Sequence, residues 1–250
     1  MARLSVNVNK VATLRNTRPL PYPSPVRLAH IALEAGADGI TIHPRPDQRH
    51  IRPQDVDDIA ELLRQWPDRE LNIEGNPFHG YVDIVRRAQP DQCTLVPDAI
   101  DQKTSDHGFD LTQDTAPLRE AIRQIRDAGG RRISLFLDAD PAQAERAAEL
   151  GVERIELYTE PYTAAFARGD YGRVLDRYVE TAETARAAGL EVNAGHDLTL
   201  DNLPTLIRSI PFLAEVSIGH ALIADALVHG MTETVRRYRL AAQGQEVVTA

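Results

Sequence analysis

Short apolar runs rich in Val, Ile and Leu alternate along the chain with stretches in which apolar residues recur at helical spacing. In four of these units the helix-like stretch ends on a glycine, and a β-type run follows directly. The four glycines are expected to form left-handed helix C-caps: Gly36, Gly129, Gly151 and Gly189. Further units lack the glycine, and the pattern predicts about eight strands that alternate with helices.

This alternation predicts a parallel sheet, either closed or open. The strand interiors read as almost continuous apolar residues, as expected when both faces of a sheet are covered. No Gly-x-Gly-x-x-Gly follows the first predicted strand, which argues against a dinucleotide-binding fold. Polar residues at the ends of strands one, two, three, seven and eight favour closure into a (β/α)8 TIM barrel with extra helices. No linker or low-complexity tract divides the chain, so residues 1–250 are expected to form a single domain.

The amino-acid composition limits which kinds of molecule the protein is expected to bind. The net charge of −9 argues against a nucleic-acid surface, which needs a basic footprint. A local group of arginines can still bind a small anionic substrate. No run has the length or apolar character of a signal peptide or a membrane span, so we expect a cytoplasmic protein without a membrane partner. The single cysteine, Cys93, lies in an apolar run and is interpreted as a core residue.

Polar side chains with acid–base or anion-binding chemistry stand where six of the predicted strands end. The apolar runs end near Asn9 and Lys10, at His43 and Arg45, at Glu74, at Asp138, at His196 and at His220. In a parallel barrel the C-terminal strand ends share one face, and active sites are built there. We therefore expect these groups to converge on one site.

Three of these side chains are candidate proton-transfer groups. His43 is followed in one loop by Arg45 and His50, which combines an imidazole that titrates near neutral pH with a phosphate-binding guanidinium. Glu74 follows an apolar strand, and partial withdrawal from water would raise its pKa and make it a general base. His196 follows two small residues that let the backbone approach a ligand. Each also has a structural alternative. His43 could belong to a solvated loop with incidental charges, Glu74 could form a salt bridge at the strand end, and His196 could be a structural histidine with all its hydrogen bonds made.

The last predicted strand leads into a candidate phosphate site. Gly219 and His220 precede a helix-like stretch whose free N–H groups would hold an anion, and barrels commonly bind phosphate after strands seven and eight. Asp138 and Glu156 also stand at predicted strand ends and are interpreted as structural. Two histidines and a carboxylate can bind a metal, but no His-x-His or His-Glu-x-x-His spacing supports this, so no metal is expected. Residues 16–25 and 98–115 fall outside the repeat and are interpreted as covers over the substrate.

The segments NVNKVATLRNTR, GADGITIHPRPDQRHI, LNIEGN, TLVPD, SLFLDAD, LEVNAGHDLT and SIGHALI occur in this order and together resemble the pyridoxine 5′-phosphate synthase family. The resemblance extends from residue 4 to about residue 240. It implies a cofactor-free β/α barrel, assembled as a homo-octamer, that condenses 1-deoxy-D-xylulose 5-phosphate with 3-amino-2-oxopropyl phosphate. The products are pyridoxine 5′-phosphate, phosphate and water.

The resemblance also implies roles by matched position. His43 and Glu74 match proton acceptors, and His196 matches a proton donor. The remaining matches are contacts to the two phosphorylated substrates: Asn7 and Arg18 to the aminoketone phosphate, Gly219 and His220 to a phosphate group, and Arg45, His50 and Thr104 to the deoxyxylulose phosphate.

The chain departs from the family pattern at three places. Asn9 and Lys10 stand where many members have Asp-His, at a substrate-contact position. Asp197 replaces the glycine that usually follows the histidine, and Gly-Asn follows Glu74 where Met-Ala is frequent. Asn9, Lys10 and Asp197 are therefore kept as substrate-binding candidates in a divergent subgroup.

Two other functions stay open at this point. Lys10 at a barrel strand end can form a Schiff base with a phosphosugar, as in class I aldolases. Alternatively, the barrel binds a phosphorylated metabolite without catalysis. The presence of His43, Glu74 and His196 together argues against loss of activity.

Overall fold

The computed structural model describes residues 1–102 and 104–247, and within them eight parallel strands close into a barrel. Each strand pairs with the next one in the chain, and β8 pairs with β1. The strands are β1 (Arg3–Asn7), β2 (Gly39–Ile42), β3 (Glu70–Gly75), β4 (Gln92–Leu95), β5 (Ile133–Leu137), β6 (Arg154–Tyr158), β7 (Glu191–Gly195) and β8 (Glu215–Ile218). The predicted (β/α)8 barrel is confirmed.

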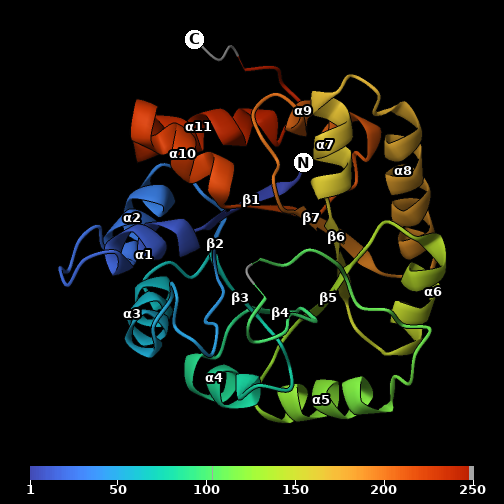
Figure 1. Ribbon diagram of the computed structural model, residues 1–250, viewed down its shortest axis with the longest axis horizontal. Coiled ribbons are helices and arrows are strands. Elements are labelled where there is room, and N and C mark those ends of the chain that lie inside the picture. The colour runs from blue at the N-terminus through green and yellow to red at the C-terminus, as the bar shows by residue number, and fades with distance from the viewer. Residues whose placement is uncertain (103, 248–250) are drawn as a thin grey trace.

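Helices surround the strands on all sides (Figure 1). They are α1 (Asn9–Asn16), α2 (Pro25–Glu34), α3 (Pro53–Arg64), α4 (Tyr81–Ala88), α5 (Ala116–Asp127), α6 (Pro141–Glu149), α7 (Glu160–Ala167), α8 (Gly172–Ala187), α9 (Leu203–Ser209), α10 (His220–His229) and α11 (Met231–Ala241). Two helices, instead of one, follow each of β1, β6 and β8, which locates the extra helices that the sequence predicted without placing. In the described part of the chain, none of the helices combines the length and apolar character needed to span a bilayer.

The predicted glycine C-caps are confirmed by backbone conformation. All four glycines have positive φ, with 103° at Gly36 as an example. In the unit that lacks a glycine after α4, Gln89 takes the left-handed position with φ of 51°. Its side-chain Nε2 donates to the Ala128 carbonyl at 2.8 Å, which helps to stabilise a conformation that is unfavourable for a residue with a Cβ.

The first strand is shorter than its apolar pattern suggests. The sequence predicted a strand that ends near Asn9 and Lys10, but β1 ends at Asn7 and α1 begins at Asn9. The reason is local: the Asn7 Oδ1 accepts a hydrogen bond from the Asn9 backbone N–H at 3.0 Å and turns the chain. Asn9 and Lys10 therefore lie in the first turn of a helix.

Polar side chains line the interior of the barrel. Ser5 and Thr41 lie 2.6 Å apart through their hydroxyl oxygens, Asn72 donates to the Thr41 hydroxyl at 3.2 Å, and Thr94 donates to the Asn72 carbonyl oxygen at 2.9 Å. These four residues are buried, and the aliphatic side chains that alternate with them pack into the core shared with the helices. The strands are therefore buried on both faces, as their apolar pattern indicated, but the inward face carries hydrogen-bonded polar side chains among the apolar ones.

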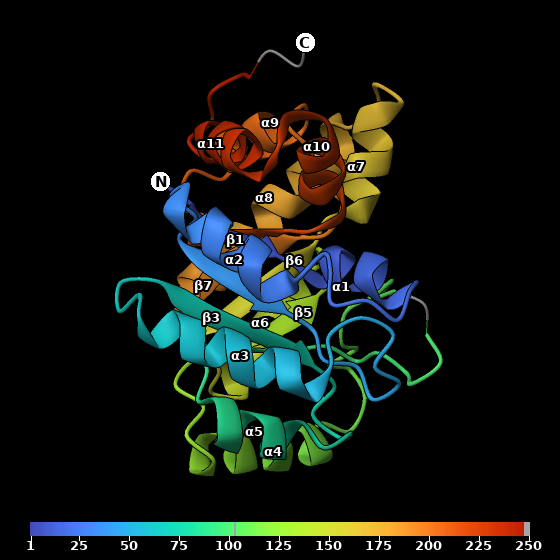
Figure 2. The same ribbon diagram turned by 90° about the vertical axis from the view of Figure 1, so that its left-hand side faces the viewer.

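The long loops lie at the end of the barrel to which the strands point. Figure 2 shows α1 and the loops after β2 and β4 together at this end. Residues 17–24 join α1 to α2, and residues 96–102 and 104–115 lie between β4 and α5, without helix or strand. Both segments match the irregular loops predicted from the sequence.

Candidate functional site

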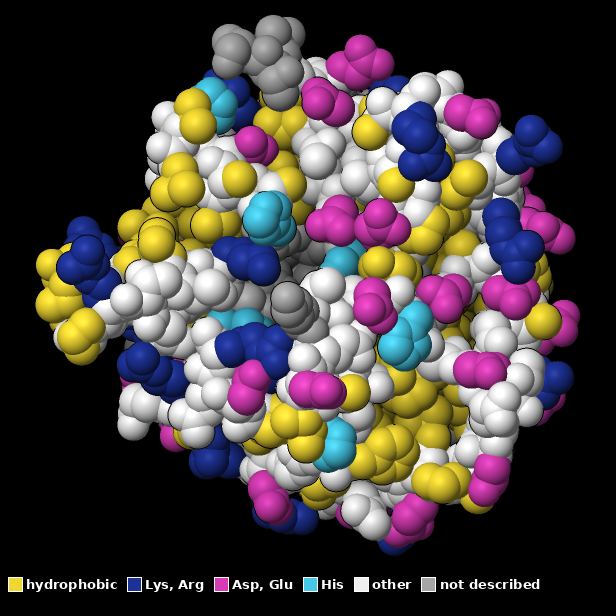
Figure 3. Space-filling view, viewed as in Figure 1, with side chains coloured by type: hydrophobic (Ala, Val, Ile, Leu, Met, Phe, Trp, Pro, Cys, Tyr) yellow, Lys and Arg dark blue, Asp and Glu magenta, His cyan; other side chains and the backbone are white. Residues whose placement is uncertain are grey.

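A cavity of about 540 Å³ opens at the C-terminal ends of the strands. Figure 3 shows this face hollowed near its centre, with Lys, Arg and His side chains gathered around the hollow. All predicted site residues except one line the cavity: Asn7, Asn9, Lys10, His43, Arg45, His50, Glu74, Thr104, His196, Asp197, Gly219 and His220.

Arg18 is the exception. It lies exposed in the loop between α1 and α2 and does not line the cavity of its own chain, because the proline-rich loop carries it away from the barrel. Asp138 follows β5, is also exposed and lies outside the cavity. Cys93 is buried in the core, as its apolar surroundings in the sequence indicated.

His43 and Glu74 lie side by side at the base of the cavity. The His43 Nδ1 lies 3.5 Å from the Glu74 Oε2. Burial, with a further contribution from the nearby Arg45 guanidinium, lowers the pKa of His43 to about 3. Burial raises the pKa of Glu74 to about 7. Near neutral pH the imidazole is therefore neutral, and the carboxyl group can both take and give a proton.

His196 is held over the cavity by an unusual backbone conformation. It has φ of 85° and Asp197 has φ of 56°, two consecutive non-glycine residues with positive φ. The Thr159 hydroxyl donates to the His196 carbonyl and stabilises this turn. The His196 ring meets Tyr158 edge to face at 5.4 Å between centroids, and its Nε2 lies 3.1 Å from the Thr104 hydroxyl oxygen. Strain of this kind, held in place by neighbours, is typical of functional sites.

Glu156 is a site residue that the sequence analysis interpreted as structural. It lies in the middle of β6 instead of at a strand end, faces into the barrel and lines the cavity. Its Oε2 is buried and has no hydrogen-bond partner among the described residues. Burial, with the Glu74 carboxylate nearby, raises its pKa well above the ordinary value. Alternation puts Glu156 on the same strand face as Arg154 and Tyr158, but the sequence alone does not show that this face points into the barrel.

Close packing explains why Gly195 precedes His196. A Cβ at this position would lie 2.3 Å from the Glu156 Oε1, which is far inside van der Waals contact. The absence of a side chain therefore makes room for the Glu156 carboxyl group beside β7. The sequence analysis expected the small residue to admit a ligand, and in the structure it admits a neighbouring carboxyl group.

The loop after β2 brings Arg45 and His50 to the cavity wall. Arg45 is buried and forms an ion pair with Asp98, and its Nη1 donates to the Gln102 carbonyl at 3.0 Å. The His50 Nδ1 accepts the Ile51 backbone N–H at 2.9 Å, so in the neutral ring the proton is on Nε2. Burial and the neighbouring His43 lower the pKa of His50 to about 3, which keeps the ring neutral.

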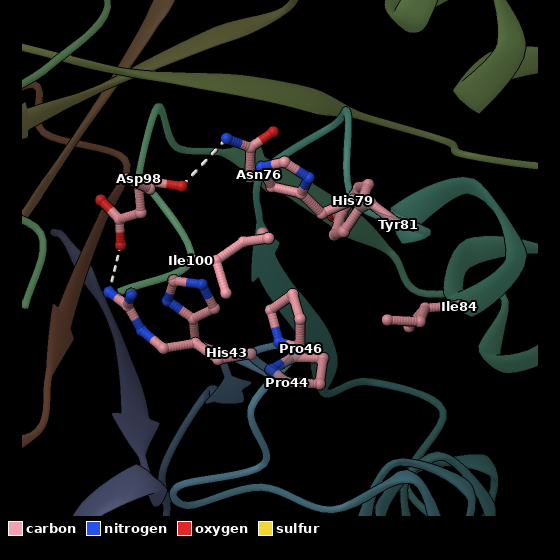
Figure 4. Close-up of a pocket in the computed structure, with 12 residues that line it drawn as sticks. His43, Pro44, Pro46, Asn76, His79, Tyr81, Ile84, Asp98 and Ile100 are labelled. Atoms are coloured by element: carbon pink, nitrogen blue, oxygen red, sulfur yellow. Dashed lines mark hydrogen bonds and ion pairs between the residues drawn. The ribbon is translucent and has the colours of Figure 1, made fainter. Parts of the chain in front are cut away.

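A pocket of about 20 Å³, large enough for a water molecule, is lined by His43, Arg45, Asn76 and Asp98 among others (Figure 4). The Gly-Asn pair after Ile73-Glu74 forms part of its wall and accounts for one departure from the family pattern. A Cβ at Gly75 would lie 2.3 Å from the Tyr81 ring, so only glycine fits. The Asn76 side chain donates to the Asp98 carbonyl at 3.0 Å, which joins the loops after β3 and β4.

The N-terminus of α10 forms another part of the cavity wall. Gly219 is its N-cap, and a Cβ there would lie 3.2 Å from the Asn7 side chain. The first N–H groups of a helix attract anions, so this wall suits a phosphate group. The described residues contain no group of three His, Cys, Asp or Glu side chains arranged to hold a metal ion.

Comparisons with known proteins show which family the chain is similar to. The family model of the pyridoxal phosphate biosynthesis protein PdxJ matches residues 4–244. The pyridoxine 5′-phosphate synthase of Albidiferax ferrireducens is 53% identical over 97% of this chain and 98% of its own length. That of Brucella anthropi is 54% identical over 95% of this chain and 97% of its own.

Among solved structures, phosphoribosyl anthranilate isomerase from Thermotoga maritima is similar with a TM-score of 0.61. It is 16% identical, and the match covers 98% of this chain and 100% of that one, so the likeness concerns the fold alone. The match of the family model over nearly the whole sequence, together with relatives that are more than half identical, shows that the chain belongs to the PdxJ family of pyridoxal phosphate biosynthesis proteins.

Proposed function

We propose that the chain is a pyridoxine 5′-phosphate synthase that condenses 1-deoxy-D-xylulose 5-phosphate with 3-amino-2-oxopropyl phosphate. The observation that carries the proposal is that His43, Glu74 and His196 line one cavity. The cavity walls also hold groups suited to two phosphates. Two anion sites and several proton-transfer groups are what a condensation of two phosphorylated substrates requires.

The proton chemistry follows from the pKa values. The amine of one substrate attacks the ketone of the other, and the new C–N bond forms only from the unprotonated amine. Glu74, with a pKa raised to about 7, accepts that proton. His196 protonates the carbinolamine oxygen, which leaves as water. His43, which is neutral before it reacts, accepts a proton in a later step that closes the ring.

Two regions of the wall are assigned to the two phosphates. The α10 N-terminus with Gly219 and His220, beside Asn7, would bind the phosphate of the aminoketone. Arg45 and the neutral His50 would bind the phosphate of the deoxyxylulose. An arginine provides planar N–H donors that match phosphate oxygens.

Lys10, Asn9 and Asp197 would adapt the site to the same substrates. The Asn9 Oδ1 accepts the His43 backbone N–H at 2.9 Å, so the amide fixes the start of the catalytic loop. Lys10 and Asp197 line the cavity as exposed charges of opposite sign. A Schiff-base lysine is usually activated by desolvation, and the exposure of Lys10 therefore favours an electrostatic contact with phosphate over an aldolase-like role.

The proposal is tested by incubating the protein with both substrates and following pyridoxine 5′-phosphate by absorbance and mass. Glu74→Gln is the control, since it keeps the shape of the side chain and removes the base. We expect product from the parent protein and little from the variant. A folded parent protein that forms no product, or borohydride trapping of a Lys10 adduct, would refute the proposal.

We further propose that residues 1–250 act as one domain, in a cytoplasmic homo-octamer. Exposed apolar side chains support the association, with Leu227 76% and Val228 77% exposed on α10. Tyr22, 65% exposed, lies in the same loop as Arg18, so subunit contact there would bring Arg18 to a neighbouring cavity. Light scattering that gives a monomer at assay concentration, with full activity, would contradict this.

A further inference from the structure

Asp98 is a buried carboxylate beside the cavity that the function so far does not use. Its side chain is 2% exposed, and that of its ion-pair partner Arg45 is 5% exposed. The Ser105 hydroxyl donates to the Asp98 Oδ2 at 2.6 Å. Because both charges are withheld from water, removing one partner would leave the other uncompensated in a dry environment.

The contacts of Arg45 use two of the three nitrogens of its guanidinium. The Nη2 donates to Asp98 and the Nη1 donates to the Gln102 carbonyl. The Nε–H has no acceptor among the described residues, and Arg45 lines the cavity. A guanidinium has five N–H donors in one plane, so fixing two nitrogens fixes the direction of the remaining donors.

Asp98 also joins the loops around the site. Its carbonyl accepts the Asn76 side chain, and Figure 4 shows Asn76 and Asp98 together on one side of the small pocket, with His43 on another. Further along the same segment, Thr104 contacts His196 at 3.1 Å. Asp98 therefore lies where the loops after β2, β3 and β4 meet, with its carboxylate on Arg45 and its backbone carbonyl on Asn76.

We propose that Asp98 is a positioning residue for phosphate recognition: its carboxylate orients Arg45 so that the unused N–H donors face the phosphate of one substrate. Asp98 itself does not touch the substrate. Without it, the long Arg45 side chain regains rotamer freedom, and fewer of its conformations point donors at the phosphate. The inference rests on the proposed function, since it concerns the substrate assigned to Arg45 and His50.

The test is a comparison of steady-state constants for Asp98→Ala and Asp98→Asn. We expect Asp98→Ala to raise the KM for 1-deoxy-D-xylulose 5-phosphate about tenfold, equivalent to a loss of about 1.4 kcal/mol. The KM for the aminoketone phosphate should change less than about twofold, and kcat less than the affected KM. Asp98→Asn keeps an acceptor oxygen for Arg45, so its KM should rise only about threefold.

A double-mutant cycle separates positioning from general damage. In an Arg45→Ala background, adding Asp98→Ala should leave the KM unchanged, because there is no guanidinium left to orient. Glu70→Ala provides a matched control: it removes ion pairs with Arg3 and Arg132 at the opposite end of the barrel. It should alter neither KM.

Several outcomes would overturn the inference while leaving the proposed function intact. They are an unchanged KM in Asp98→Ala, an equal rise of both KM values, or an additive cycle with Arg45→Ala. If Asp98→Ala does not fold, Asp98→Asn decides, because it preserves side-chain volume. A lower KM in Asp98→Asn would mean that Asp98 competes with phosphate for Arg45, which contradicts positioning. A parent protein that forms no product would refute the proposed function instead.

Discussion

The turnover rate kcat of the enzyme–substrate complex is expected to rise with pH around neutrality, because Glu74 must be ionised to accept a proton. An ordinary glutamate has a pKa of 4.5, and burial at the base of the cavity raises the pKa of Glu74 to about 7. A carboxyl group with this pKa is about one tenth ionised at pH 6, half at pH 7 and nine tenths at pH 8. Turnover should therefore increase about tenfold between pH 6 and pH 8.

The assay measures kcat with both substrates saturating, at constant ionic strength from pH 5 to pH 9. The constant kcat reports groups in the enzyme–substrate complex, whereas kcat/KM would also include the ionisation of free substrate phosphates near pH 6. Glu74→Gln is measured in parallel. We expect its turnover to fall by about 10²- to 10⁴-fold, the usual contribution of a positioned acid–base group.

Two results would refute this reasoning. An acid limb near pH 4.5 would mean that Glu74 is hydrated in the working enzyme, so that burial does not set its pKa. A residual Glu74→Gln activity that keeps the limb near pH 7 would assign the limb to another group. His43 is not an alternative source, because its pKa is lowered to about 3.

Further predictions concern residues around this centre and at the other end of the barrel. Glu156→Gln keeps the shape of a buried side chain but removes its acidic proton, and kcat should fall at least about tenfold with little change in KM. Thr104→Val removes the hydroxyl beside the His196 Nε2, and kcat should fall a few-fold, by about 1 kcal/mol in the barrier. Glu215 is buried, and its pKa is raised from 4.5 to about 7, so the folded protein holds this proton more tightly than the unfolded chain does. The free energy of unfolding should therefore decline as pH rises from about 4.5 through 7. Urea unfolding should therefore show Glu215→Gln more stable than the parent protein at pH 8, by about 1–3 kcal/mol, and not at pH 4; equal gains at both pH values would contradict this.

The fold and the face that carries the site could be predicted because both depend on local pattern. Helical spacing that ends on a glycine such as Gly36, followed by a β-type run, identifies each unit. Parallel strands then fix a single face for all strand ends. His43, Glu74 and His196 were found in this way, since each stands at or beside the end of a strand.

Residues whose position depends on closure of the barrel could not be found in the same way. Glu156 lies in mid-strand, and its place in the cavity follows from the inward face of β6, which the sequence alone does not distinguish from the outward one. Asp98 meets Arg45 across 53 positions of sequence, through loops without a repeating pattern. The length of β1 depends on one hydrogen bond that the Asn7 side chain accepts from the Asn9 backbone N–H. This bond competes with strand propensity and ends the strand early.

The polar interior of the barrel connects the chemistry of the site with the stability of the fold. Glu74, Glu156 and Glu215 all face this interior, and burial is the largest cause of the raised pKa of each. A purely aliphatic interior would offer these carboxyl groups no polar neighbours. An open aqueous channel would hydrate them and return their pKa values to the ordinary range. The barrel therefore raises the pKa of these carboxyl groups by enclosing them among hydroxyl and amide side chains such as Thr94 and Asn72. Because the same enclosure opposes ionisation at both ends of the barrel, it favours proton transfer by Glu74 near neutral pH and lowers stability at high pH through Glu215.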